Sequence, residues 1–129
     1  MQEHFIRKET SLGVKEAAEK ISVVAKEHGF GTLNTLDLQA IMAGKGVEYA
    51  EAATVVEVCR PADAKKVLEL DQRVAAFLPC RIAVSTQGGK TIAHTIKPSA
   101  MIGMLGNIEL AKVACEIDEA MEKIINALP

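Results

Sequence analysis

Two stretches of the chain carry hydrophobic residues at helical spacing, one near each end. In each, an apolar stripe is flanked by charged positions, which is typical of an amphipathic helix whose apolar side faces a core. Thr10 and Ser11 offer N-cap oxygens before the first helix, and Gly29 suits its C-terminus. Asn107 suits the N-cap of the second helix. The predicted buried stripes are Val14, Ala17, Ala18, Ile21, Val24 and Ala25, and then Leu110, Ala114, Ile117, Met121, Ile124, Ile125 and Leu128.

Between these helices, residues 54–59 alternate as a strand does. Val56 and Val58 fall on one face, and Glu57 and Cys59 fall on the other. Pro61 follows directly, where it ends the strand and fits the first turn of a helix.

The sharpest local signal is a β-hairpin. Cys80–Gln87 and Lys90–Ile96 flank Gly88-Gly89, and glycines readily adopt the positive φ angles of a two-residue turn. Neither face of this hairpin is strongly polar, so we expect helices to cover one face and a second subunit to cover the other. The turn predicts a register that pairs Gln87 with Lys90, Val84 with Ala93 and Ala83 with His94.

Shorter elements fill the remaining chain, and we find no repeat or linker. We expect a loop over residues 44–53, where no clean period exists. The other predicted elements are strands near Phe5 and over residues 30–35, and short helices around Leu38, Ile41 and Met42, after Pro61, after Asp71 and after Pro98.

Length and composition favour one ordinary globular domain, because 129 residues with 49% hydrophobic and 25% charged residues can bury a core. A net charge of −2, one Tyr and three Phe offer neither a basic patch nor a stacking platform, so nucleic-acid binding is disfavoured. The N-terminus lacks the basic and apolar regions of a signal peptide, and no apolar run approaches about 18 residues. We therefore expect neither export nor a membrane partner. Three scattered cysteines then indicate free thiols in a reducing cytoplasm.

Three segments carry a family resemblance. The run EVCRPADAKKVLELD, the following LPCRIAV with its glycine hairpin, and a proline-led helix with LGN resemble the family catalogued as domain of unknown function 302, across residues 1–129 as one domain. The resemblance implies an α+β fold in which an antiparallel β-sheet packs against helices, with a topology like that of TATA-binding-protein-like domains. It also implies a homodimer. It brings no established reaction, and a shared topology does not imply DNA binding.

Cys59 and Cys80 are the first candidates for a site. Each lies beside a proline-containing turn at the end of a strand, and the two strands are expected to be adjacent, which would bring the sulfurs together. Arg60 and Arg81 follow the two cysteines directly and would favour thiolates. The alternative is that both cysteines are small core residues, the commonest role of buried Cys.

Other candidates are weaker. Glu57 shares a strand face with Cys59 and could act as a base in a pocket, or could be solvated. His94 falls on the hairpin face opposite Cys80. No Cys-x-x-Cys pair or close His pair supports a metal site, and no glycine motif supports a nucleotide, so we expect no metal and no cofactor. Cys115, beside the last helix's apolar stripe, is expected to pack.

Two functions remain open, and the sequence leaves enzyme activity undecided. The first is a dimeric module for small-molecule binding or assembly, with a pocket near Cys59, Cys80 and residues 44–53. The second is a thiol-dependent protein that handles sulfur, redox equivalents or a soft metal through the same two cysteines. A hydrolytic enzyme using Glu57 or His94 has no motif behind it.

Overall fold

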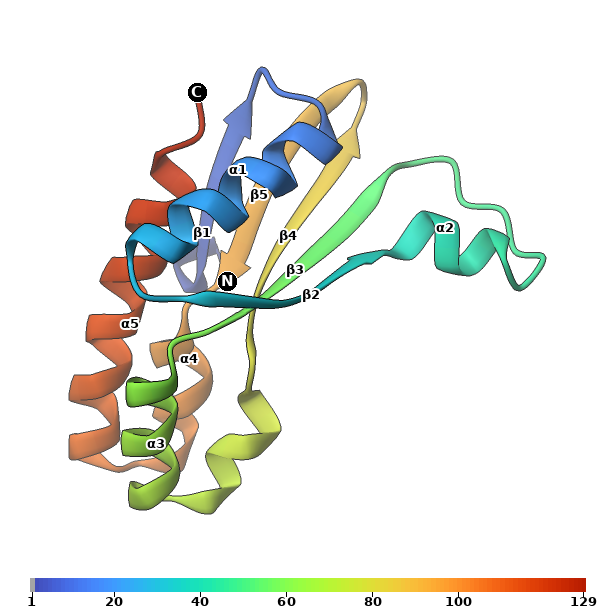
Figure 1. The fold of residues 1–129 in the computed structure, drawn as a ribbon. Coiled ribbons are helices and arrows are strands. Elements are labelled where there is room, and N and C mark those ends of the chain that lie inside the picture. Colours follow the sequence, from blue (N-terminus) through green and yellow to red (C-terminus); the bar gives the residue numbers. More distant parts are fainter. Residues whose placement is uncertain (1) are drawn as a thin grey trace.

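The computed structural model describes residues 2–129, which form one antiparallel sheet with helices on one face (Figure 1). The fold is a single α+β domain, as predicted. A short 3-10 turn, Gln2–His4, precedes the first strand. The strands follow the order β1-β5-β4-β3-β2 across the sheet, and their bounds are β1 Phe5–Thr10, β2 Gly31–Asp37, β3 Ala53–Cys59, β4 Cys80–Gln87 and β5 Lys90–Ile96.

The β4–β5 hairpin has the register predicted from its glycines. Gln87 pairs with Lys90, and φ is 57° at Gly88 and 81° at Gly89, as a two-residue turn with positive φ requires. Val84 with Ala93 and Ala83 with His94 also pair as predicted.

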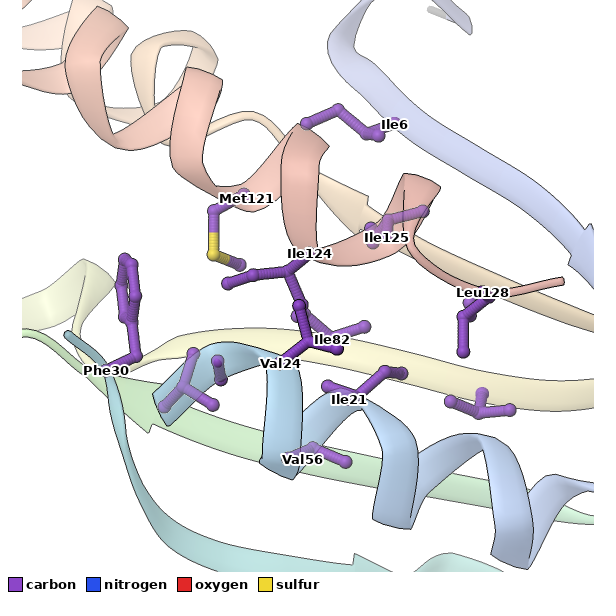
Figure 2. Close-up of a cluster of buried hydrophobic side chains, with 14 of the residues drawn as sticks. Ile6, Ile21, Val24, Phe30, Val56, Ile82, Met121, Ile124, Ile125 and Leu128 are labelled. Atoms are coloured by element: carbon purple, nitrogen blue, oxygen red, sulfur yellow. The ribbon is translucent and has the colours of Figure 1, made fainter. Parts of the chain in front are cut away.

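The two long helices, α1 (Val14–Glu27) and α5 (Ile108–Asn126), bury the predicted stripes against the sheet. Figure 2 shows their side chains meeting those of β3 and β4 in one cluster. Asn107 caps α5 by accepting a hydrogen bond from the backbone N–H of Leu110 over 3.1 Å. The labelled members of the cluster include Ile21, Val24, Val56, Ile82, Met121 and Ile124.

The predicted cap of α1 is wrong. The N-cap residue is Gly13, which has no side chain, and the hydroxyl of Thr10 instead accepts a hydrogen bond from the backbone N–H of Leu12. Helix propensity from Val14 onward and burial of the apolar stripe therefore fix the start of this helix.

A second buried cluster lies beyond one end of the sheet. Two short helices, α3 (Pro61–Leu70) and α4 (Pro98–Ile102), pack beside the first half of α5, and the 3-10 helix η2 (Gln72–Phe77) packs against both of them (Figure 1). After α4 comes one further 3-10 turn, η3 Gly103–Leu105. The buried members of this cluster are Val67, Val74, Ile102, Leu110 and Ala114.

The other face of the sheet is open. We define the open face by five residues that alternation places away from α1 and α5: Phe5, Arg7, Val55, Ala83 and His94. Four of them form one row across the sheet, because Arg7 pairs with His94, His94 with Ala83 and Ala83 with Val55. Helices cover one face of the β4–β5 hairpin, as predicted. The second subunit expected on this face stays a prediction.

Between β2 and β3 the chain projects away from the body as an arm, residues 38–52, which begins with α2 (Leu38–Ala43) (Figure 1). Asp37 caps α2 by accepting a hydrogen bond from the N–H of Ala40 over 2.9 Å. No residue of α2 is buried. The short helix and the following loop agree with the sequence, but nothing in the sequence indicated that they would leave the body.

Within residues 2–129, no helix is both long enough and apolar enough to cross a bilayer.

Candidate functional site

Cys59 and Cys80 lie at the same end of the sheet. Cys59 is the last residue of β3 and Cys80 the first of β4, and these antiparallel strands pair with Val58 opposite Cys80. The prediction that the two strands are adjacent is therefore confirmed. Both thiols are free and partly buried.

The two cysteines line one cavity between the sheet end, α3, α4 and α5. Its volume is about 20 Å³, which is room for about one water molecule, since one water needs roughly 10–15 Å³ by this measure. An organic ligand therefore does not fit the cavity in this conformation. Other residues that line it are Phe30, Arg60, Asp63, Met101 and Ile102.

Arg60 is held by three partners, none of them a sulfur. Its Nη1 donates a hydrogen bond to the carbonyl oxygen of His28 over 3.2 Å, and its Nε donates to the Asp63 carboxylate in an ion pair. The guanidinium carbon lies 4.8 Å from the centroid of the Phe30 ring, within cation–π range. Arg60 thereby ties the start of α3 to the C-terminal end of α1.

The thiol of Cys80 is protonated at neutral pH. Its pKa is raised from 9.0 to about 11, chiefly by burial and also by the nearby Cys59 and Asp63, whereas Arg60 lowers it by less. The prediction that neighbouring arginines favour a thiolate is therefore wrong for Cys80. Desolvation of the charged form outweighs the attraction of an arginine whose charge is already shared with Asp63.

Arg81 pairs with Glu57 across β3 and β4, with 3.0 Å between Nε and Oε2. This cross-strand ion pair directs the charge of Arg81 toward a carboxylate and away from Cys80. The Glu57 side chain is only 12% exposed whereas that of Arg81 is 55% exposed, so the arginine covers the carboxylate. The proposed role of Glu57 as a base stays a prediction.

His94 lies on the open face, apart from the cysteines. Its ring meets Phe5 edge-on, with 6.1 Å between centroids and 64° between planes. Burial lowers the pKa of His94 below 6.5, and the charge of Arg7 lowers it further. A neutral, half-buried imidazole is thus available on the open face beside Phe5 and Arg7.

The structure brings together only part of the predicted site. Cys59 and Cys80 share a cavity, but residues 44–53 do not belong to it, because they lie at the opposite end of β3 from Cys59. The pocket predicted between them is therefore wrong. Cys115 is exposed, which also corrects its predicted packing role, since it lies just outside the buried stripe of α5.

Sequence reasoning also missed two residues of the cavity, Asp63 and Met101. The spacing of Asp63 three residues after Arg60, at the start of a helix, could have indicated an ion pair. Met101 comes from a distant element, and no local pattern points to it.

Taken together, the sheet order and helix arrangement define a one-domain α+β protein with a sulfur-lined cavity at the sheet end. The chain belongs to the family described as "Domain of unknown function DUF302", whose match covers residues 6–128. A solved structure titled "Crystal structure of uncharacterized conserved protein DUF302 from Bacillus stearothermophilus" is 26% identical and has a TM-score of 0.93, with 98% of each chain covered. No curated protein matches the chain.

Proposed function

We propose that the protein is a cytoplasmic homodimeric assembly module, in which the arm of one copy packs on the open face of the other. The observation that carries this proposal is the projecting arm, which has its own helix but buries nothing. Three free cysteines, which stay reduced in the cytoplasm, support the location.

The arm exposes several large apolar side chains to solvent. Leu38, Ile41, Val47 and Tyr49 are all exposed, Ile41 by 49%. Large apolar side chains gathered on one projection usually mark an interaction site. An amphipathic helix that presents such residues is a common element of recognition.

A second copy of this chain is the favoured occupant because the open face complements the arm. The open face carries apolar Phe5 and Val55 together with Arg7, which has no ion-pair partner within residues 2–129. The arm carries two carboxylates against one lysine, namely Glu48 and Glu51 with Lys45, and Asp37 adds a third carboxylate at its base. Opposite charge around apolar groups favours a reciprocal contact, since each copy of a two-fold dimer presents both surfaces.

Sedimentation velocity over a range of concentrations tests the proposal. We expect a dimer for the unchanged chain, and a dissociation constant raised by at least about tenfold in Ile41→Asp, because a charge would then be buried in the contact. Ile108→Asp is the matched control: Ile108 is 74% exposed at the start of α5, outside the arm and the open face.

A monomer at high micromolar concentration contradicts the proposal outright. Loss of the dimer in Ile108→Asp but not in Ile41→Asp would contradict it too, since the interface would then lie near the start of α5. Arg7→Glu gives a separate check on the open face and should weaken association as Ile41→Asp does.

The small-molecule role has less support, because the cavity at Cys59 and Cys80 holds about one water molecule. A catalytic thiolate at Cys80 has less support as well, because its raised pKa keeps the thiol protonated. Apart from the short helices α2, α3 and α4 and the 3-10 turns, the chain runs through one strand, a helix, four strands and a closing helix, and this order supports the TATA-binding-protein-like topology as an inference about fold alone.

A further inference from the structure

We propose that Cys59, Cys80 and Met101 form a binding site for one soft monovalent cation of the Cu(I) type. This inference is independent of the assembly proposed above. It concerns the opposite end of the molecule from the arm.

The three sulfur-bearing residues come from three separate elements. Cys59 ends β3, Cys80 begins β4, and Met101 lies in α4, yet all three line the same small cavity. Both cysteines are free and partly buried.

The size of the cavity favours an ion without its water. A volume of about 20 Å³ has no room for a hydrated cation. Its lining is mainly apolar, with Phe30, Phe77 and Ile102 among the residues. A soft ion that exchanges its water for sulfur suits such a site, whereas Mg²⁺ and Ca²⁺ require oxygen ligands.

The ligand types also disfavour zinc. Structural zinc sites use four ligands from Cys, His, Asp and Glu. Within residues 2–129, no group of three or more such side chains is placed to hold a metal. Asp63 is the only carboxylate that lines the cavity, and it is bound to Arg60. Two thiolates and a thioether remain, and this soft set selects Cu(I).

Binding releases two protons, one from each thiol, and forms two metal–thiolate bonds without change of oxidation state. The complex of two thiolates and one monovalent cation carries one negative charge. The cation replaces the repulsion between two neighbouring thiolates with attraction to both. Because a thiol must lose its proton to bind a metal ion, affinity rises with pH.

The test is an anaerobic titration of the full chain carrying Cys115→Ser, with Cu(I) in competition with bicinchoninate. The Cys115→Ser change removes the exposed thiol, which would bind copper at the surface. We expect one ion per chain. Cys59→Ser and Cys80→Ser should each lower the affinity by more than about a hundredfold, because loss of outer partners alone costs about 10–100-fold.

Met101→Leu should lower the affinity by about tenfold, in the range of a weakly held ligand. Met104→Leu is its matched control, because Met104 lies three residues further on and is 71% exposed. Equal affinities for the two methionine variants would remove Met101 from the site. Affinity unchanged in either cysteine variant would overturn the site itself.

X-ray absorption at the copper edge keeps the proposal testable if a cysteine variant does not fold. On the Cys115→Ser chain we expect sulfur ligands only. Nitrogen or oxygen ligands in the first coordination sphere would overturn the proposal without any change to Cys59, Cys80 or Met101.

Discussion

The guanidinium of Arg60 and the carboxylate of Asp63 form an ion pair across the first turn of α3, beside the cavity. Asp63 is 8% exposed, so water hardly reaches its carboxylate and Arg60 supplies the opposite charge beside it. The same guanidinium covers Phe30 and binds the carbonyl oxygen of His28. One arginine thus holds α1, α3 and the sheet end together.

Arg60→Ala should lower the free energy of unfolding by about 2 kcal/mol, because it leaves a nearly buried carboxylate unpaired and removes packing on Phe30. Lys65→Ala is the control. It breaks the exposed Lys65–Glu69 pair, with 3.8 Å between Nζ and Oε1, and should change stability by less than about 0.5 kcal/mol. Urea unfolding measures both. Equal effects would show that the Arg60 pair contributes no more than a surface pair.

The raised pKa of Cys80 predicts a loss of stability in alkali. The unfolded thiol ionises near 9.0 and the folded thiol near 11, so the folded state favours the protonated form. Its contribution is complete below pH 9.0 and is lost as the pH rises through about 11. Cys80→Ala should remove up to about 3 kcal/mol of this alkaline decline. Unfolding curves of both proteins across this window measure the difference, and parallel declines would contradict the prediction.

Alkylation should distinguish the thiols at neutral pH. We expect iodoacetamide to modify exposed Cys115 first and Cys80 far more slowly until the chain unfolds, because Cys80 is partly buried and its pKa is raised. Mass spectrometry of the reduced protein gives the rate at each cysteine. Rapid modification of Cys80 in the folded chain would restore the thiolate interpretation.

His94 predicts a second pH dependence, at the acidic side. Its folded pKa lies below 6.5, chiefly through burial and further through Arg7. Stability from the neutral ring is therefore present above pH 6.5 and is lost as the pH falls through the folded pKa. NMR titration should give a pKa for His94 below that of an exposed histidine. Arg7→Gln should raise it, and no change in Arg7→Gln would mean that burial alone sets it.

The arm should be dispensable for the fold. Replacement of residues 38–53 by an Asn-Gly turn should keep the β2–β3 pairing, which ends with Asp37 opposite Thr54, and change the free energy of unfolding by less than about 1 kcal/mol, because α2 buries no residue. Circular dichroism and urea unfolding of the monomer measure this outcome. Loss of the folded state would show that the arm is part of the core.

Much of the local structure could be predicted from the sequence. The stripes of α1 and α5 follow from spacing, the alternation of β3 from residues 54–59, and the β4–β5 register from Gly88-Gly89. These features are set by backbone geometry and by the period of apolar residues, which neighbours along the chain define. The pairing that brings Cys59 beside Cys80 could be predicted as well, because the strands bearing them pair in sequence order.

Only the tertiary structure decided where the polar and sulfur groups point. Arg60 follows Cys59 directly but turns to Asp63 and Phe30, because the nearly buried carboxylate of Asp63 attracts the guanidinium strongly. Met101 joins the cysteines only through the packing of α4 beside α5.

Only the tertiary structure decided, likewise, which apolar and sulfur-bearing side chains are exposed. Cys115 and the apolar residues of the arm resemble core positions in composition, yet they lie at the surface. The spacing of apolar residues along the sequence predicts that a helix has an apolar side. The non-local arrangement of the other elements decides whether anything in the same chain covers that side, and for α2 nothing within residues 2–129 does.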